Sequence, residues 1–164
     1  MTDHQLRIAI DEIGSAIIEL PWTAVPLSLN DRGQTRGAMF AKARKIADVR
    51  KTALQLADAA NLPRPVAHVT VQLHYRPRDN RRRDTDNLVA TLKPICDALT
   101  AGRAAGKTRT GKAIKAQLGY GMVPDDIPRY MAKPEPIIHQ AERGEPGAMW
   151  LELTWAIGTR LEEA

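Results

Sequence analysis

Two aspartates two residues apart, Asp84 and Asp86, are the side chains of this sequence best suited to chemistry. In an extended segment, side chains at positions i and i+2 project to the same side. Paired carboxylates are ligands that Mg²⁺, or Mn²⁺, prefers, with water and substrate phosphate in the other positions. Lys93 lies seven residues after Asp86, two turns along the predicted helix on about the same face, and helical side chains lean toward the N-terminus. The spacing therefore predicts two metal ligands with a cation for developing phosphate charge.

Three consecutive arginines precede this pair. Arg81, Arg82 and Arg83 carry the charge that contacts with a nucleic-acid backbone require. A simpler interpretation stays open, in which Asp86 or Asn87 caps the following helix and the arginines form a solvated, charge-balanced loop. The arginines before the pair and the lysine in register after it favour a functional site.

Two further stretches are candidates for contacts with phosphates. Residues 21–36 show no periodicity, and loops of this length are uncommon unless they are functional or disordered. Arg32 and Arg36 within them are candidate phosphate contacts, or parts of an ordinary polar connector. Residues 37–60 are the longest predicted helix, apolar on one face and strongly basic elsewhere, which indicates a solvated surface or a secondary surface that faces DNA.

A second acidic pair, Asp125 and Asp126, lies in the turn-rich stretch 121–130. Taken alone, this pair is typical of a Pro-Asp turn. It is also a source of a third carboxylate for a site at Asp84 and Asp86.

Residues 102–119 are small, polar and basic. Gly106–Lys112 matches the phosphate-loop pattern G-x-x-x-x-G-K, but Ala113 stands where a Ser or Thr would hold magnesium. The stretch also follows a predicted helix, whereas a phosphate loop follows a strand. We interpret it as a mobile basic insertion.

The composition favours a single domain with a polyanionic partner. The chain has 164 residues, a formal charge of +5 and a pI near 9.6. Its one cysteine, Cys96, lies on an apolar helical stripe and is expected in the core. Neither a membrane-spanning run nor a signal pattern is found in the sequence, so we expect a soluble, cytoplasmic protein, in a host cell's cytoplasm if a phage or prophage encodes it.

The order of predicted elements indicates an α/β or α+β domain with a mixed sheet and helices packed on it. A lead-in of residues 1–15, with a short helix ending at Gly14, precedes a domain of residues 16–158 and a tail of residues 159–164. The predicted strands cover residues 16–20, 65–77, 136–140 and 149–157, and the predicted helices cover 37–60 and 86–100, with a bend at Pro94. His68 and His74, on the polar face of the second strand, are candidate metal ligands or, as we prefer, parts of an exposed or dimer-facing surface.

Several motifs together resemble the RusA-type Holliday junction resolvases. They are a strand that ends in L-P-W, then R-R-R-D-T-D-N, a downstream lysine, D-A-L on the same helix, and a later D-D. The resemblance runs from about Ile17 to Ala156. It implies a homodimeric, magnesium-dependent endonuclease that cuts four-way DNA junctions. It matches Asp84 and Asp86 to the paired catalytic carboxylates, Asp126 to the third, and Lys93 to an essential lysine.

Two other classes of protein remain open. One is a non-catalytic DNA-binding or replication accessory protein, whose acidic residues only cap a helix and balance charge. The other is a calcium-binding module, which fits poorly because Val89 and Ile95 stand where an EF-hand loop starting at Asp84 needs Gly and Glu.

Overall fold

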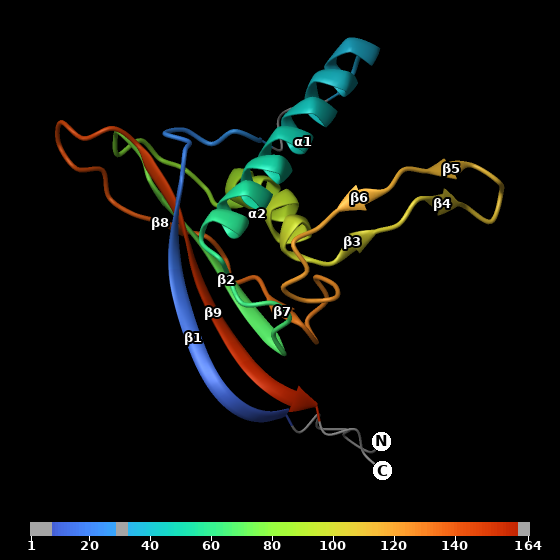
Figure 1. Cartoon of the computed structure of the whole chain (residues 1–164). Helices are drawn as coiled ribbons and strands as arrows, with labels where there is room; N and C mark the ends of the chain where they lie inside the picture. The colour runs from blue at the N-terminus through green and yellow to red at the C-terminus, as the bar shows by residue number, and fades with distance from the viewer. Residues whose placement is uncertain (1–7, 29–32, 161–164) are drawn as a thin grey trace, which may run out of the picture.

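The computed structural model describes residues 8–28 and 33–160 (Figure 1). Its helices are α1 (Arg36–Ala59) and α2 (Asp86–Leu99). Its strands are β1 (Ile8–Leu20), β2 (His68–Arg76), β3 (Gly102–Arg103), β4 (Gly106–Lys107), β5 (Ala113–Ile114), β6 (Gln117–Leu118), β7 (Met131–Ala132), β8 (Ile137–Ile138) and β9 (Ala148–Arg160).

One mixed sheet organises the molecule, with the strand order β1-β9-β2-β7 and with β8 also paired to β2. The long strands β1, β9 and β2 are antiparallel, whereas the short strands β7 and β8 run parallel to β2. Figure 1 shows β1 and β9 as two long, strongly curved neighbours. The predicted α+β class, a mixed sheet with helices packed on it, is confirmed.

Strand alternation places the core between this sheet and the two helices. Val69, Val71, Leu73 and Tyr75 of β2 are buried, and their cross-strand partners include Leu151 and Leu153 of β9. Apolar residues of both helices join the same cluster, namely Val49, Ala53 and Ala57 of α1 and Leu88, Leu92, Ile95 and Leu99 of α2. Both helices therefore cover one face of the sheet.

Local sequence explains the two helices. Thr35 caps α1, because its hydroxyl accepts a hydrogen bond from the Ala38 amide at 3.1 Å. In α2 the apolar residues recur every three or four positions, which buries one side of the helix against the sheet. Pro94 lies inside α2 and is buried, and the helix continues through it to Leu99.

Both ends of the predicted domain needed correction. A helix ending at Gly14 was expected before a strand at residue 16, but β1 begins at Ile8 and pairs with β9 along its length. Strand β9 likewise continues to Arg160, beyond the expected end at residue 157. Both strands are longer than expected because the backbone groups of each form hydrogen bonds with the other. Residues 8–15 and 159–160 thus belong to the sheet and not to a lead-in or a tail.

Cys96 is fully buried, as its position on the helical stripe predicted. Burial raises the pKa of its thiol to about 12, so the side chain stays neutral and serves as a small apolar group. In the described part of the chain, neither helix combines the length and the apolar character needed to cross a membrane.

Candidate nucleic-acid and metal site

The loop between β2 and α2 is organised by one aspartate that sequence reasoning overlooked. Asp79 accepts a hydrogen bond from the Arg83 guanidinium at 2.6 Å and another from the Arg81 amide at 3.2 Å. The bond from Arg83, followed by the one from the Arg81 amide, lowers the pKa of Asp79. Arg83 also donates to two backbone carbonyls of the loop, whereas the side chain of Arg81 is 80% exposed. Arg83 thus braces the loop, while Arg81 and Arg82 face solvent.

The helix after this loop begins differently from the expected cap. Thr85 is the N-cap residue and adopts an α-helical backbone conformation, so neither Asp86 nor Asn87 caps α2. Asp86 lies in the first turn, where the helix dipole favours a carboxylate. The amide oxygen of Asn87 accepts a hydrogen bond from the Ser28 hydroxyl at 2.9 Å. The capping interpretation of the acidic residues is therefore wrong.

The same turn changes the geometry of the aspartate pair. We expected an extended segment, but Thr85 has helical dihedral angles and Asp86 is already in α2. Asp84 lines a hollow of about 500 Å³ together with Arg82 and Arg83. Asp86 lines a different hollow, so the extended geometry that would project both carboxylates into one space is not present.

The second hollow, of about 580 Å³, is the candidate site. It is lined by three of the predicted residues. Asp86 and Lys93 belong to α2, and Asp126 comes from a distant part of the chain. Asp86 and Lys93 meet there because both lie on one face of α2, as their spacing predicted. Asp126 belongs to the turn before β7. Its neighbour Asp125 does not line the hollow, and the Asp125 carboxylate accepts a hydrogen bond from the Asp126 amide at 2.7 Å.

Lys133, which sequence reasoning missed, pairs with Asp126 in this hollow. The Lys133 ammonium donates a hydrogen bond to Oδ2 of Asp126 at 2.9 Å. This bond lowers the pKa of Asp126, so that carboxyl stays ionised well into the acid range. Burial is the largest single effect on Lys133 and lowers the pKa of its ammonium, but the hydrogen bond to Asp126 and the negative charges nearby, that of Asp126 first, together raise this pKa. No local sequence pattern predicts that Lys133 lies in this hollow, because the pairing of β7 in the sheet sets the position of its segment.

Asp97 is a further acidic group beside the site. It lies four residues after Lys93 and eleven after Asp86, on the same face of α2, so the helical period could have identified it. Burial raises the pKa of Asp97, the negative charge of Asp126 adds to that effect, and the charge of Lys93 opposes it. A cluster of carboxylates and ammonium groups therefore extends from Asp86 along α2 toward the Asp126 turn.

The oxygen donors in the hollow are of the type that Mg²⁺ prefers, although they do not surround one point closely enough to form a complete metal site. Among the described residues, no group of three or more His, Cys, Asp or Glu side chains is gathered closely enough to hold a metal ion. Mg²⁺ is, however, commonly held by one or two carboxylates, with water and substrate phosphate in the remaining positions. Asp86 and Asp126 are such a pair of hard-oxygen donors on the wall of one hollow.

The outlying candidates have different positions. Arg36 is exposed at the start of α1, and Arg32 lies outside the described residues. His74, one of the two candidate histidines, is buried in hydrogen bonds to His139 and Glu152, each 2.9 Å long, and its ring stacks on Trp150. This cluster lies on the sheet face away from the helices, so His74 is part of a polar layer and not of the candidate site.

Comparisons with known proteins do not identify the chain. No family model matches it. A search of curated proteins also finds no match.

Proposed function

We propose that this protein is a magnesium-dependent, structure-specific endodeoxyribonuclease that resolves four-way DNA junctions by hydrolysing phosphodiester bonds. The observation that carries the proposal is the single hollow lined by Asp86, Lys93 and Asp126. These are the residue types that a phosphodiester hydrolase uses, and two of them come from a segment distant from the third. Arg81 and Arg82, exposed on the adjoining loop, add positive charge at the position where a backbone would enter.

Each side chain has a defined task in this proposal. Asp86 and Asp126 would hold Mg²⁺. The resemblance also assigns Asp84 as a ligand, but Asp84 lines the other hollow, so this proposal gives it no contact with the ion. When bound, the ion supplies Lewis-acid charge at the scissile phosphate and activates water. Lys93 stabilises the negative charge that develops on the phosphorus oxygens in the transition state. Lys133 is hydrogen-bonded to Asp126 and lowers the pKa of that carboxyl.

The choice of a four-way junction as substrate rests on the resemblance to RusA-type resolvases. Such a junction has two-fold symmetry, so a C2 homodimer would offer one site to each of two opposed strands. Exposed apolar side chains support a dimer: Ile13 and Ile17, on the solvent side of edge strand β1, are 68% and 69% exposed. We expect light scattering to give twice the mass of the chain, and Ile13→Glu with Ile17→Glu to give the monomer.

A nicking assay tests the activity. A synthetic four-way junction labelled on each strand in turn should be cut in Mg²⁺ or Mn²⁺ and left intact in EDTA, while a linear duplex of the same sequence stays uncut. Asp86→Asn and Asp126→Asn should abolish cleavage and spare binding. Asp125→Asn is the matched control, since it removes the same charge one residue away from the hollow. Full activity in Asp86→Asn would refute the site.

The same assay distinguishes the second candidate function. A specific observation favours it: Asp126 is already paired with Lys133, and Asp84 lines another hollow. A non-catalytic DNA-binding or accessory protein would bind the junction equally well without divalent metal and would leave it uncut with metal.

A further inference from the structure

The basic insertion forms a two-stranded ribbon that projects from the body. Strand β3 pairs with β6 and β4 pairs with β5, all antiparallel. Gly102 faces Leu118 and Lys107 faces Ala113 in one continuous register, so no bulge interrupts the ribbon. The tip is closed by hydrogen bonds from the Thr108 amide to the Lys112 carbonyl at 2.8 Å and from the Gly111 amide to the Thr108 carbonyl at 2.9 Å. Figure 1 shows the ribbon extending away from both the sheet and the helices.

The net positive charge of the chain resides in this ribbon. Residues 101–119 contain five basic side chains and no acidic one: Arg103, Lys107, Arg109, Lys112 and Lys115. The whole chain has 24 Lys and Arg against 19 Asp and Glu, so outside the ribbon the two signs balance at 19 each. All five basic side chains are exposed. An exposed segment of one sign, on a body with no net charge, is an electrostatic surface for an anion.

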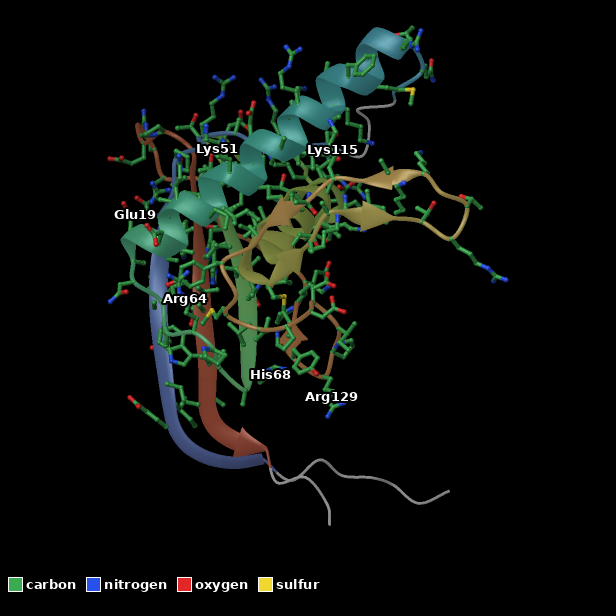
Figure 2. The ribbon with its side chains drawn as sticks, turned by 45° about the vertical axis from the view of Figure 1, so that its right-hand side comes forward. Glu19, Lys51, Arg64, His68, Lys115 and Arg129 are labelled. Atoms are coloured by element: carbon green, nitrogen blue, oxygen red, sulfur yellow. The ribbon has the colours of Figure 1, made fainter. Side chains whose placement is uncertain are left out.

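The ribbon has two chemically different faces. Opposed residues of an antiparallel pair share a face, so Arg103, Lys107 and Lys115 lie on one side, in company with alanines and a glutamine. Over residues 102–107 and 113–118, the other side carries only glycine and alanine apart from Ile114 and Leu118. In Figure 1 the return strand, with β5 and β6, runs nearer to α1 than β3 and β4 do, and Figure 2 labels Lys115 on the side of the ribbon toward α1.

The root of the ribbon is firmly held. Gly102 and Gly119 sit so close together that a Cβ on Gly119 would lie 2.4 Å from the Gly102 nitrogen. Tyr120 donates a hydrogen bond from its buried hydroxyl to the Leu62 carbonyl at 2.6 Å, and the Arg64 guanidinium lies 4.2 Å from its ring centroid. Arg50 of α1 donates a hydrogen bond to the Leu118 carbonyl. The ribbon is thus a braced projection.

The ribbon is also placed next to the candidate site. It leaves the end of α2, the helix that carries Asp86 and Lys93, and its return strand leads within a few residues to Asp126. The Tyr120 and Met122 amides donate hydrogen bonds to the carbonyls of the last residues of α2, at 2.8 and 2.9 Å. A ligand held in the hollow and extending along α2 toward Leu99 would therefore reach the root of the ribbon.

We propose that the ribbon is an arm that binds the phosphates of a DNA duplex next to the cleavage site. This inference rests on the proposed function, because the duplex that the ribbon would bind is one arm of the junction substrate. Eight residues, 102–109, span roughly 25 Å in extended form. That distance corresponds to about seven base pairs of duplex at roughly 3.4 Å each. Residues 101–119 contain no aromatic residue, and aromatic side chains are typical of segments that anchor at a membrane surface.

Binding measurements in EDTA test the arm without any need for cleavage. The variant Lys107→Gln, Arg109→Gln, Lys112→Gln and Lys115→Gln removes four of the five positive charges of the ribbon. Arg103 is kept because it donates a hydrogen bond to the Lys115 carbonyl at 3.2 Å. Fluorescence anisotropy on a labelled junction should show that the slope of log K against log salt becomes flatter by about three to four units. The charge-conserving variant Arg109→Lys with Lys112→Arg should bind like the wild type. Arg143→Gln, in the β8–β9 loop on the opposite side of the molecule, should keep the wild-type slope, whereas Arg109→Gln should flatten it by about one unit (Figure 1).

A chemically altered junction locates the contact. Neutral methylphosphonates replace the phosphates about five to nine base pairs from the crossover. This change should weaken binding by the wild type and have a much smaller effect on the fourfold variant. The proposal is overturned if the fourfold variant keeps the wild-type slope, or if both proteins lose the same affinity on the altered junction. If the wild type binds but never cuts, the proposed nuclease function fails, while the arm is still judged by these slopes.

Discussion

Lys133 offers a sharp test of the candidate site, because its ammonium lies 2.9 Å from the carboxylate that we assign to the metal. A divalent cation must displace this ammonium to use the same oxygen of Asp126. Removing the positive charge should therefore make cation binding tighter. We expect Lys133→Gln to need less Mg²⁺ or Mn²⁺ than the wild type.

The magnitude follows from the exposure of the pair. The two side chains are 36% and 27% exposed, and ion pairs in such surroundings contribute about 0.2–1 kcal/mol. Since about 1.4 kcal/mol corresponds to a factor of ten, the half-saturating metal concentration should fall by up to about fivefold. The free energy of unfolding should fall by no more than about 1 kcal/mol. The folded-state pKa of Asp126 lies below its ordinary value of 3.8, so this contribution is present above that pH and is lost as the pH falls through the lower folded-state value.

Three measurements check this prediction. Calorimetric titration with Mn²⁺ gives the affinity directly, a Mg²⁺ series in single-turnover nicking gives the functional requirement, and urea unfolding gives the stability. Lys51→Gln is the control, because it removes one positive charge from the exposed surface of α1 (Figure 2). If Lys133→Gln needs as much metal as the wild type, or more, the assignment of Asp126 as a ligand is refuted.

Four further outcomes are expected. Lys93→Ala should lower the single-turnover cleavage rate about a hundredfold or more, with junction affinity unchanged and with partial recovery in Lys93→Arg; a wild-type rate would make it an ordinary surface lysine. Replacing Arg81 and Arg82 together with alanine should flatten the salt dependence of junction binding by about two units, and an unchanged slope would assign them to a solvated loop. Leu73→Ala, at a fully buried position of β2, should reduce the free energy of unfolding in urea by about 2–5 kcal/mol, and a much smaller loss would contradict the described core. Burial, followed by the charge of His74, holds the pKa of His139 below its ordinary value of 6.5. The contribution of His139 to the free energy of unfolding is therefore complete above pH 6.5 and is lost as the pH falls through the lower folded-state pKa. His139→Gln should make urea stability less dependent on pH over that range, and an unchanged dependence would exclude His139 as the titrating group.

Several features could be predicted because they depend only on neighbours in the chain. The helical spacing of α2 correctly placed Asp86 and Lys93 on one face. The alternation of β2 correctly predicted its buried apolar residues, but it placed His74 on an exposed surface, and His74 is buried. Cys96 was expected in the core for the same reason. Periodicity is a local property, since every third or fourth residue of a helix, or every second residue of a strand, must face the same way.

The details at the start of α2 could not be predicted in this way. An extended segment and a helical turn place side chains two residues apart in different directions, and no pattern decided between them at Thr85. The backbone there became helical, so Asp84 and Asp86 line different hollows. The same choice made Thr85 the N-cap residue and left Asp86 in the first turn.

The sequence by itself determined the helix face of the candidate site, the residues of the central strand that form the core, and the basic character of residues 102–119. Only the tertiary structure decided that Asp126 reaches the hollow of Asp86, that Lys133 meets it there, and that the basic segment is a braced ribbon beside them. These outcomes join segments far apart in the chain. Their meeting depends on which strand ends adjoin in the sheet and on what packs beneath them, and a local pattern carries no record of either.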